Sequence, residues 1–168
     1  MFGRLFEFAL DGETAGSEQT PAPSPPLPPR PDFQGLEFLV GGVWLATPMP
    51  GTTYSEAIQW TLDGQYMTST QITSTPPSAA SLTNGFLGLD AAKQLIVMWG
   101  FSTTGASVNL VQVKPSDPNT WVFQGLVRGL LTRQTMIKQG PLAMQTITET
   151  LAKGQWKATP PVNYQRAP

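Results

Sequence analysis

Hydrophobic and polar residues alternate with a period of two over much of residues 33–168, a pattern typical of strands with one buried face. The run Phe38–Thr47 opens this region with strong strand formers placed around Gly41 and Gly42, and the turn-forming segment Pro48–Gly51 follows it. We predict that Phe38–Thr47 is the first strand of a closed sheet, with a bend or a close backbone approach at the two glycines.

The alternation is clearest from Tyr54 to Leu62, where every second residue is Tyr54, Glu56, Ile58, Trp60 or Leu62. The Asp63-Gly64 pair that follows is typical of a hairpin turn. Turn-forming sequences then recur about every ten residues, which is the spacing of an antiparallel sandwich or barrel. We predict an all-β protein, an antiparallel up-and-down barrel of about 8–10 strands. Its further strands are expected at Tyr66–Thr75, Gly85–Asp90, Gln94–Phe101, Ser107–Lys114, Trp121–Val127, Thr132–Gln139, Leu142–Leu151, Gln155–Thr159 and Asn163–Arg166.

The first 32 residues have a different character and are predicted to be an anchor segment and linker that precede a barrel domain of residues 33–168. Residues 1–12 carry one helical apolar stripe, and residues 21–31 are rich in proline, which favours an extended spacer. A helix this short needs a surface to fold on. Three surfaces remain open: its own barrel, another protein, or a membrane interface. The side chains expected to anchor it on a partner are Phe2, Leu5, Phe6 and Leu10.

The composition excludes several kinds of chemistry. Charged residues make up 12% of the chain and its net charge is −1, so nothing points to nucleic acid as a partner. The chain has no Cys and no His, which removes disulfides, thiolate and Ser-His-Asp catalysis, and His-ligated zinc or haem. We therefore expect no metal and no cofactor. No apolar run is long enough to span a membrane, and no convincing signal peptide is present, so we expect a cytoplasmic protein or one peripheral to a membrane complex.

Several aromatic and glycine motifs carry a resemblance to lipocalin-like (calycin) β-barrels, and more closely to bacterial lipocalin-like families of unassigned function. The resemblance covers residues 33–168 and excludes the N-terminal segment. It implies that Trp44 plugs the closed end of the barrel and that Arg166 lies across its ring as a structural clasp. Haem-binding relatives use a His that this chain lacks. The motifs are Phe38-x-x-Gly41-Gly42-x-Trp44, Trp60-x-Leu62-Asp63-Gly64, Gly85-x-x-Gly88-x-Asp90, Trp99-x-Phe101 with Gly105, Trp121-x-Phe123-x-Gly125, and Trp156 with Tyr164-x-Arg166.

A barrel of this size either fills its interior with side chains or holds one small ligand. If a cavity is present, we expect aromatic and polar side chains from several strands to line it. Glu56 would have a raised pKa if it points inward, and could then act as an acid or base. The alternative is that Glu56 lies in solvent or pairs with Arg133 or Arg128. The candidate cavity residues are Tyr54, Glu56, Trp60, Thr68, Thr70, Trp99 and Gln112.

Three functions are compatible with these features. The first is a non-catalytic accessory subunit, tethered through residues 1–31 to a larger protein complex that could itself be membrane-associated. The second is a carrier of a small hydrophobic ligand, which requires a continuous apolar cavity of several hundred Å³. The third is a cofactor-independent isomerase or cyclase, which requires an ionisable group buried in that cavity. No residue is assigned a catalytic role from sequence.

Overall fold

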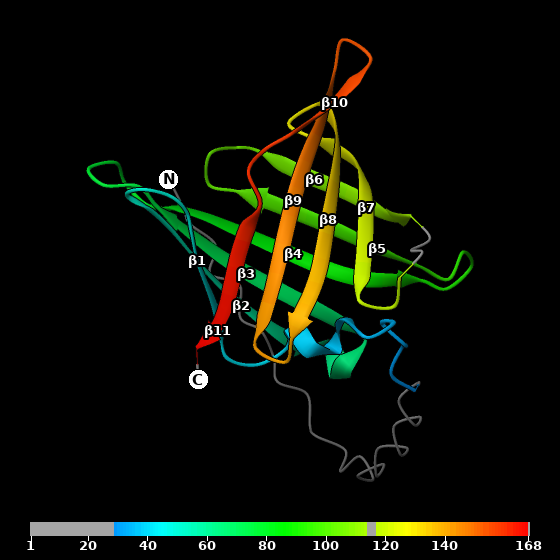
Figure 1. Ribbon diagram of the computed structural model, residues 1–168. Helices are drawn as coiled ribbons and strands as arrows, with labels where there is room; N and C mark the ends of the chain where they lie inside the picture. The colour runs from blue at the N-terminus through cyan, green and yellow to red at the C-terminus, as the bar shows by residue number, and fades with distance from the viewer. Residues whose placement is uncertain (1–28, 114–116, 168) are drawn as a thin grey trace, which may run out of the picture.

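The fold is a closed β-barrel in which every strand pairing is antiparallel (Figure 1). The structure is a computed structural model that describes residues 29–113 and 117–167. The helix expected in residues 1–12 and most of the proline-rich arm lie outside these residues. The strands are β1 (Val43–Met49), β2 (Thr52–Thr61), β3 (Tyr66–Ser74), β4 (Ser81–Asp90), β5 (Leu95–Ser102), β6 (Ser107–Val113), β7 (Thr120–Val127), β8 (Leu130–Gly140), β9 (Ala143–Ala152), β10 (Gln155–Ala158) and β11 (Val162–Ala167), with short 3₁₀ helices η1 (Leu36–Leu39) and η2 (Leu62–Gly64).

The strands follow an up-and-down order, since each strand from β1 to β9 pairs with the next along the chain. The barrel closes because β9 also pairs with β11, which in turn pairs with β1. Ten strands therefore form the closed barrel, and β10 is an extra strand attached to β9. The predicted all-β antiparallel barrel is confirmed, and the arrangement is consistent with a lipocalin-like barrel.

The last strand of the barrel is interrupted. β10 and β11 pair in succession with the same edge of β9: Ala158 lies opposite Glu149, and Val162 lies opposite Thr146. Between them the chain carries Pro160 and Pro161, which have no N–H to donate to the sheet. The prolines therefore break this strand and separate β10 from β11.

The prediction of a single first strand over Phe38–Thr47 is wrong at its beginning. Leu36 and Leu39 are fully buried, and they lie three residues apart within η1, one turn of a 3₁₀ helix. Gly41 and Gly42 then have φ angles of 87° and 68°, which turn the chain into β1. The glycines thus separate a buried 3₁₀ turn from the strand.

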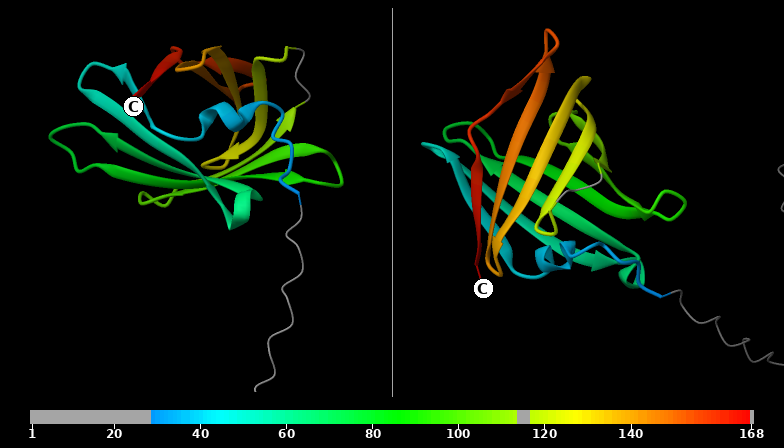
Figure 2. Two further views of the ribbon diagram at one scale, coloured as in Figure 1. Left: turned by 90° about the horizontal axis from the view of Figure 1, so that it is seen from below. Right: turned by 45° about the vertical axis from the view of Figure 1, so that its right-hand side comes forward.

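The segment that contains η1 closes one end of the barrel (Figure 2, left). Phe33, Leu36 and Leu39 have no exposed surface and join the core cluster there. Trp44 is also fully buried, and its indole N–H donates to the backbone carbonyl of Leu39 over 2.8 Å. The hydrophobic core is therefore concentrated at this end, which leaves the opposite end of the barrel for a cavity.

Trp44 and Arg166 lie opposite each other on β1 and β11 at the closed end. The guanidinium carbon of Arg166 is 5.5 Å from the centroid of the indole ring, within the range of a cation–π contact. The same guanidinium donates to the carbonyls of Phe38 at 2.9 Å and Val40 at 3.1 Å. Arg166 thus joins the last strand to the segment that closes the barrel.

Candidate ligand-binding site

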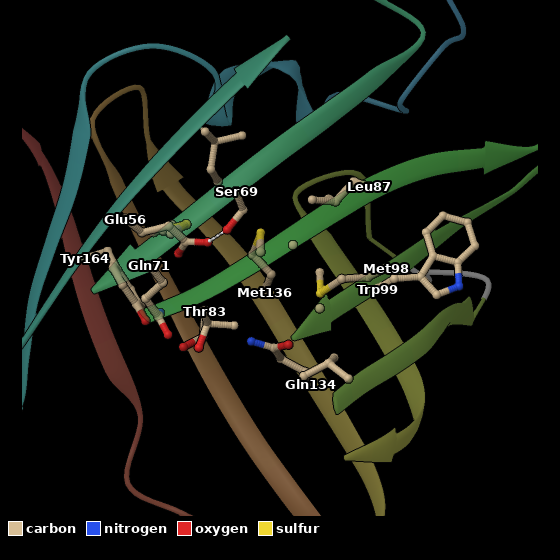
Figure 3. A pocket seen from close by; sticks show the side chains of 16 residues that line it. Glu56, Ser69, Gln71, Thr83, Leu87, Met98, Trp99, Gln134, Met136 and Tyr164 are labelled. Carbon is tan, nitrogen blue, oxygen red and sulfur yellow. Dashed lines mark hydrogen bonds between the residues drawn. The ribbon is translucent and has the colours of Figure 1, made fainter. Parts of the chain in front are cut away.

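The interior of the barrel holds a cavity of about 180 Å³ beyond the packed closed end (Figure 3). It is bounded by inward-facing residues of seven strands, β2 to β6, β8 and β9, and by Tyr164 of β11. The apolar side chains that point into it are Ile58, Leu87, Met98, Val108, Met136 and Met144, and the polar ones are Glu56, Ser69, Gln71, Thr83, Gln134, Thr146 and Tyr164.

A wider and more open space of about 520 Å³ adjoins this cavity toward the other end of the barrel. Its rim comes from the end of β1 (Pro48 and Met49) and from the segment of Thr159 and Pro160 that interrupts the last strand. The two spaces share the lining residues Gln71, Val108, Gln134, Thr146 and Tyr164. The inner cavity therefore opens outward through this mouth.

Glu56 projects into the inner cavity from β2 (Figure 3). The hydroxyl of Ser69 donates to its Oε1 over 2.5 Å, and this is the one hydrogen bond that the described residues make to the carboxyl group. Burial raises the pKa of Glu56 above its ordinary value of 4.5, and the hydrogen bond from Ser69 partly opposes that rise. The side chain is half-buried and lines the cavity.

Two tyrosines lie near Glu56. Tyr164 lines both the inner cavity and the mouth, and its ring stacks on that of Tyr54 with a centroid distance of 6.4 Å. Burial raises the pKa of Tyr164 well above its ordinary value, and the charge of Glu56 raises it further. Tyr164 therefore stays neutral at physiological pH and presents a hydroxyl group and an aromatic face to the cavity.

One alternative was that Glu56 lies in solvent or pairs with Arg133 or Arg128. In the structure it lies in the cavity and pairs with neither arginine. Arg133 points outward from β8, where it forms two hydrogen bonds of 2.7 and 2.8 Å with Glu149 and stacks on Trp156. In the described parts of the chain, no Lys or Arg lines either the cavity or its mouth. Glu56 is the single ionisable carboxyl group of that lining.

Two of the expected cavity residues belong instead to the closed end. Trp60 packs edge-on against Phe33 at 5.5 Å and carries the guanidinium of Arg30 at 4.4 Å from its ring centroid. Gln112 is buried, accepts from the backbone N–H of Ile96 at 2.9 Å, and donates to Gln34 at 2.8 Å. Both positions face inward, but the chain before β1 occupies the space that a ligand would need.

Thr68 and Thr70 do not line the cavity, because the inner face of β3 consists of Met67, Ser69 and Gln71. Thr70 is exposed and bonds to Asn84 on the outer surface. Strand β3 is rich in Ser and Thr on both faces, so its hydrophobic pattern gives little indication of its orientation. The buried Met67 was the one residue that could have indicated it.

Trp99 borders the cavity, but its ring points away from the cavity center in Figure 3 and is 38% exposed. The same outer face of the sheet exposes Phe86, directly opposite Trp99, and Phe101, two residues further along β5. Tyr54 does contribute to the site, at the mouth. Of the seven expected residues, Tyr54 and Glu56 thus have side chains in the site.

Most of the polar lining of the cavity was not predicted from the sequence. Ser69, Gln71, Thr83, Gln134 and Thr146 come from four different strands, and the fold brings them together only when the barrel closes.

Within the described residues no cluster of three or more acidic side chains could hold a metal ion. In the same part of the chain, no helix has the length and hydrophobicity needed to cross a membrane.

The chain matches no known protein family model, and it matches no curated protein.

The buried carboxyl group gives a pH-dependent prediction. Because the folded state raises the pKa of Glu56, protonated Glu56 contributes stability that is present below its unfolded value near 4.5 and lost as pH rises through the folded value. Glu56→Gln should therefore raise the melting temperature at pH 7, by roughly 3–5 °C for each kcal/mol recovered. The difference from wild type should shrink as pH falls to about 4. Thermal melts that show no gain at pH 7 would contradict the burial of an ionised Glu56.

Proposed function

We propose that the barrel binds a small, mostly apolar molecule in its interior. The observation that carries this proposal is the inner cavity of about 180 Å³ that opens into a mouth of about 520 Å³. Binding sites for small molecules are typically concave, largely apolar and furnished with a few placed polar groups. Here Met98, Met136 and Met144 supply an adaptable apolar surface, and Glu56 and Tyr164 supply the polar groups.

The proposal is tested with N-phenyl-1-naphthylamine, a neutral probe whose fluorescence rises in apolar surroundings. Val108 lines both the inner cavity and the mouth, so Val108→Trp should block the passage and reduce probe binding at least about tenfold. Val111→Trp is the matched control, since Val111 lies on the same strand and faces outward at 37% exposure. Equal binding by both variants would place the probe outside the barrel and contradict the proposal.

A relationship to lipocalin-like (calycin) barrels is part of the same proposal. It is supported by the closed antiparallel barrel and by the contact between Trp44 and Arg166 at its closed end. Ligand carriage is the role that this architecture suits, because one end is packed and the other is open.

Chemistry at Glu56 is a second candidate. A buried carboxyl group with a raised pKa in a cavity is the requirement for a cofactor-independent isomerase or cyclase that moves a proton. This candidate differs from a carrier in one respect, since the bound molecule would be released chemically changed. Recovery of bound molecules unchanged after incubation with the protein would support carriage.

Attachment to a larger assembly is a third candidate, favoured by the exposed Phe86, Trp99 and Phe101 on the outer face. Residues 1–12 are proposed to bind the same assembly, so they should contribute little to the stability of the barrel itself.

We expect that deleting residues 1–20 leaves the melting temperature unchanged within about 1 °C. Deletion through Leu36 should lower it strongly, because Phe33 and Leu36 are fully buried. A large loss from the shorter deletion would show that residues 1–12 pack on their own barrel.

A further inference from the structure

The charge distribution around the cavity limits what it can bind. Across the described lining of the inner cavity and the mouth, Glu56 is the one carboxyl group, and no basic side chain is present. A ligand carboxylate or phosphate placed there would meet the Glu56 carboxyl group and no counter-charge in a partly desolvated site. Anionic ligands, including fatty acids, are therefore disfavoured.

Glu56 has hydrogen-bonding capacity to spare. An ionised carboxylate accepts several hydrogen bonds, and the described residues supply one, from Ser69 to Oε1. The carboxyl group borders the open space of the cavity, where a ligand donor could reach it (Figure 3). The carboxyl group of Glu56 is thus a hydrogen-bond acceptor with room for a donor group of the ligand.

The tyrosine pair suits the same donor. Tyr164 lies near Glu56 in the cavity lining (Figure 3), and its ring stacks on that of Tyr54, which lines the mouth. Aromatic faces attract cations through the ring quadrupole, and the attraction grows as the site is desolvated. A carboxylate beside two tyrosine rings therefore favours a cationic group over a neutral one.

We infer that the ligand is an amine, whose ammonium group pairs with Glu56 beside Tyr164 and Tyr54 while its apolar part lies against Met98, Met136 and Met144. This inference rests on the proposed function, because it assigns a chemical class to the occupant of the same cavity. An ammonium also offsets the cost of burying the Glu56 carboxylate without a counter-charge. In addition, charge-assisted hydrogen bonds are about twice as strong as neutral ones. A neutral alcohol of the same length lacks this contribution.

The test is isothermal titration calorimetry of the full chain at pH 7 with three probes that share one alkyl chain: octylamine, octan-1-ol and octanoate. We expect octylamine to bind at least about tenfold more tightly than octan-1-ol, and octanoate to bind most weakly. Glu56→Gln should lower the affinity for octylamine at least about tenfold while changing that for octan-1-ol by less than about threefold. Glu149→Gln removes the same charge on the outer surface and should leave all three affinities unchanged.

The outcomes separate this inference from the proposed function. Binding of octan-1-ol as tight as that of octylamine, or an octylamine affinity unaffected by Glu56→Gln, overturns the amine assignment and leaves a carrier of neutral molecules. Tightest binding of octanoate overturns it in the same way. Failure of all three probes to bind counts against the proposed function itself.

Discussion

Trp44→Ala is expected to lower the free energy of unfolding by about 3–5 kcal/mol, the usual cost of removing a large buried aromatic side chain. Trp44 has no exposed surface, contacts the ring of Phe38 edge-on at 5.8 Å, and holds the carbonyl of Leu39 through its indole N–H. The substitution therefore removes packing at the closed end and leaves a buried carbonyl without its partner. Chemical denaturation of wild type and variant measures the difference.

Arg166→Ala removes the cation–π contact and the two hydrogen bonds to the carbonyls of Phe38 and Val40 while keeping the indole in place. We expect a smaller loss, about 1–3 kcal/mol, and no change in ligand affinity, since Arg166 lies outside the cavity lining. A Trp44→Ala loss below about 1 kcal/mol would contradict the structural role of the closed end.

Gly125→Ala is expected to destabilise the barrel by at least about 2 kcal/mol, because a methyl group there has no space. Gly125 lies on β7 opposite Leu110, and a Cβ built on it overlaps the backbone carbonyl oxygen of Asn109 on β6. Backbone in the middle of a sheet cannot move aside as a flexible side chain can, so the two strands would have to separate.

Gly140→Ala is the matched control for this effect. Gly140 ends β8, and a Cβ at that position has no other heavy atom within 4 Å. The melting temperature of the Gly140→Ala variant should stay within about 2 °C of the wild-type value. Equal stability of the two alanine variants would show that β6 and β7 do not approach as closely as the structure has them.

The strands were predictable from the sequence because barrel strands alternate and turn residues separate them. Tyr54, Glu56 and Ile58 on β2 were placed on one face, and that face is the inner one. The hairpin at Asp63-Gly64 was also expected, and the chain does turn back there through η2, with positive φ at both residues. Local pattern was sufficient wherever a strand had one apolar face.

The cavity was much less predictable, since it depends on how far each strand extends past the packed end. Trp60 and Gln112 do face inward, but the segment before β1 fills the space beside them. Trp99 was expected inside from its hydrophobicity, yet it lies on an outer face that carries other exposed aromatic residues. The orientation of such strands is decided by the register of the whole barrel, which single-strand patterns do not contain.

The polar lining of the cavity could not be predicted from the sequence for a related reason. Gln71 lies directly opposite Glu56 on the neighbouring strand, and Ser69, which donates to Glu56, lies diagonally across from it, so both positions arise from strand pairing. Thr146 and Tyr164 then reach the same wall because β9 pairs with β11 at closure. No stretch of sequence brings these residues near one another.

The central claim, that the interior of the barrel is a ligand site, is tested most directly by the ε-methyl NMR signals of the methionines during titration with octan-1-ol. Met98, Met136 and Met144 line the inner cavity, whereas Met67 is fully buried in the core and is not part of the cavity lining. We expect the three cavity methyl signals to shift in a saturable way while the Met67 signal stays fixed. Saturating probe that leaves the three cavity signals in place would contradict it.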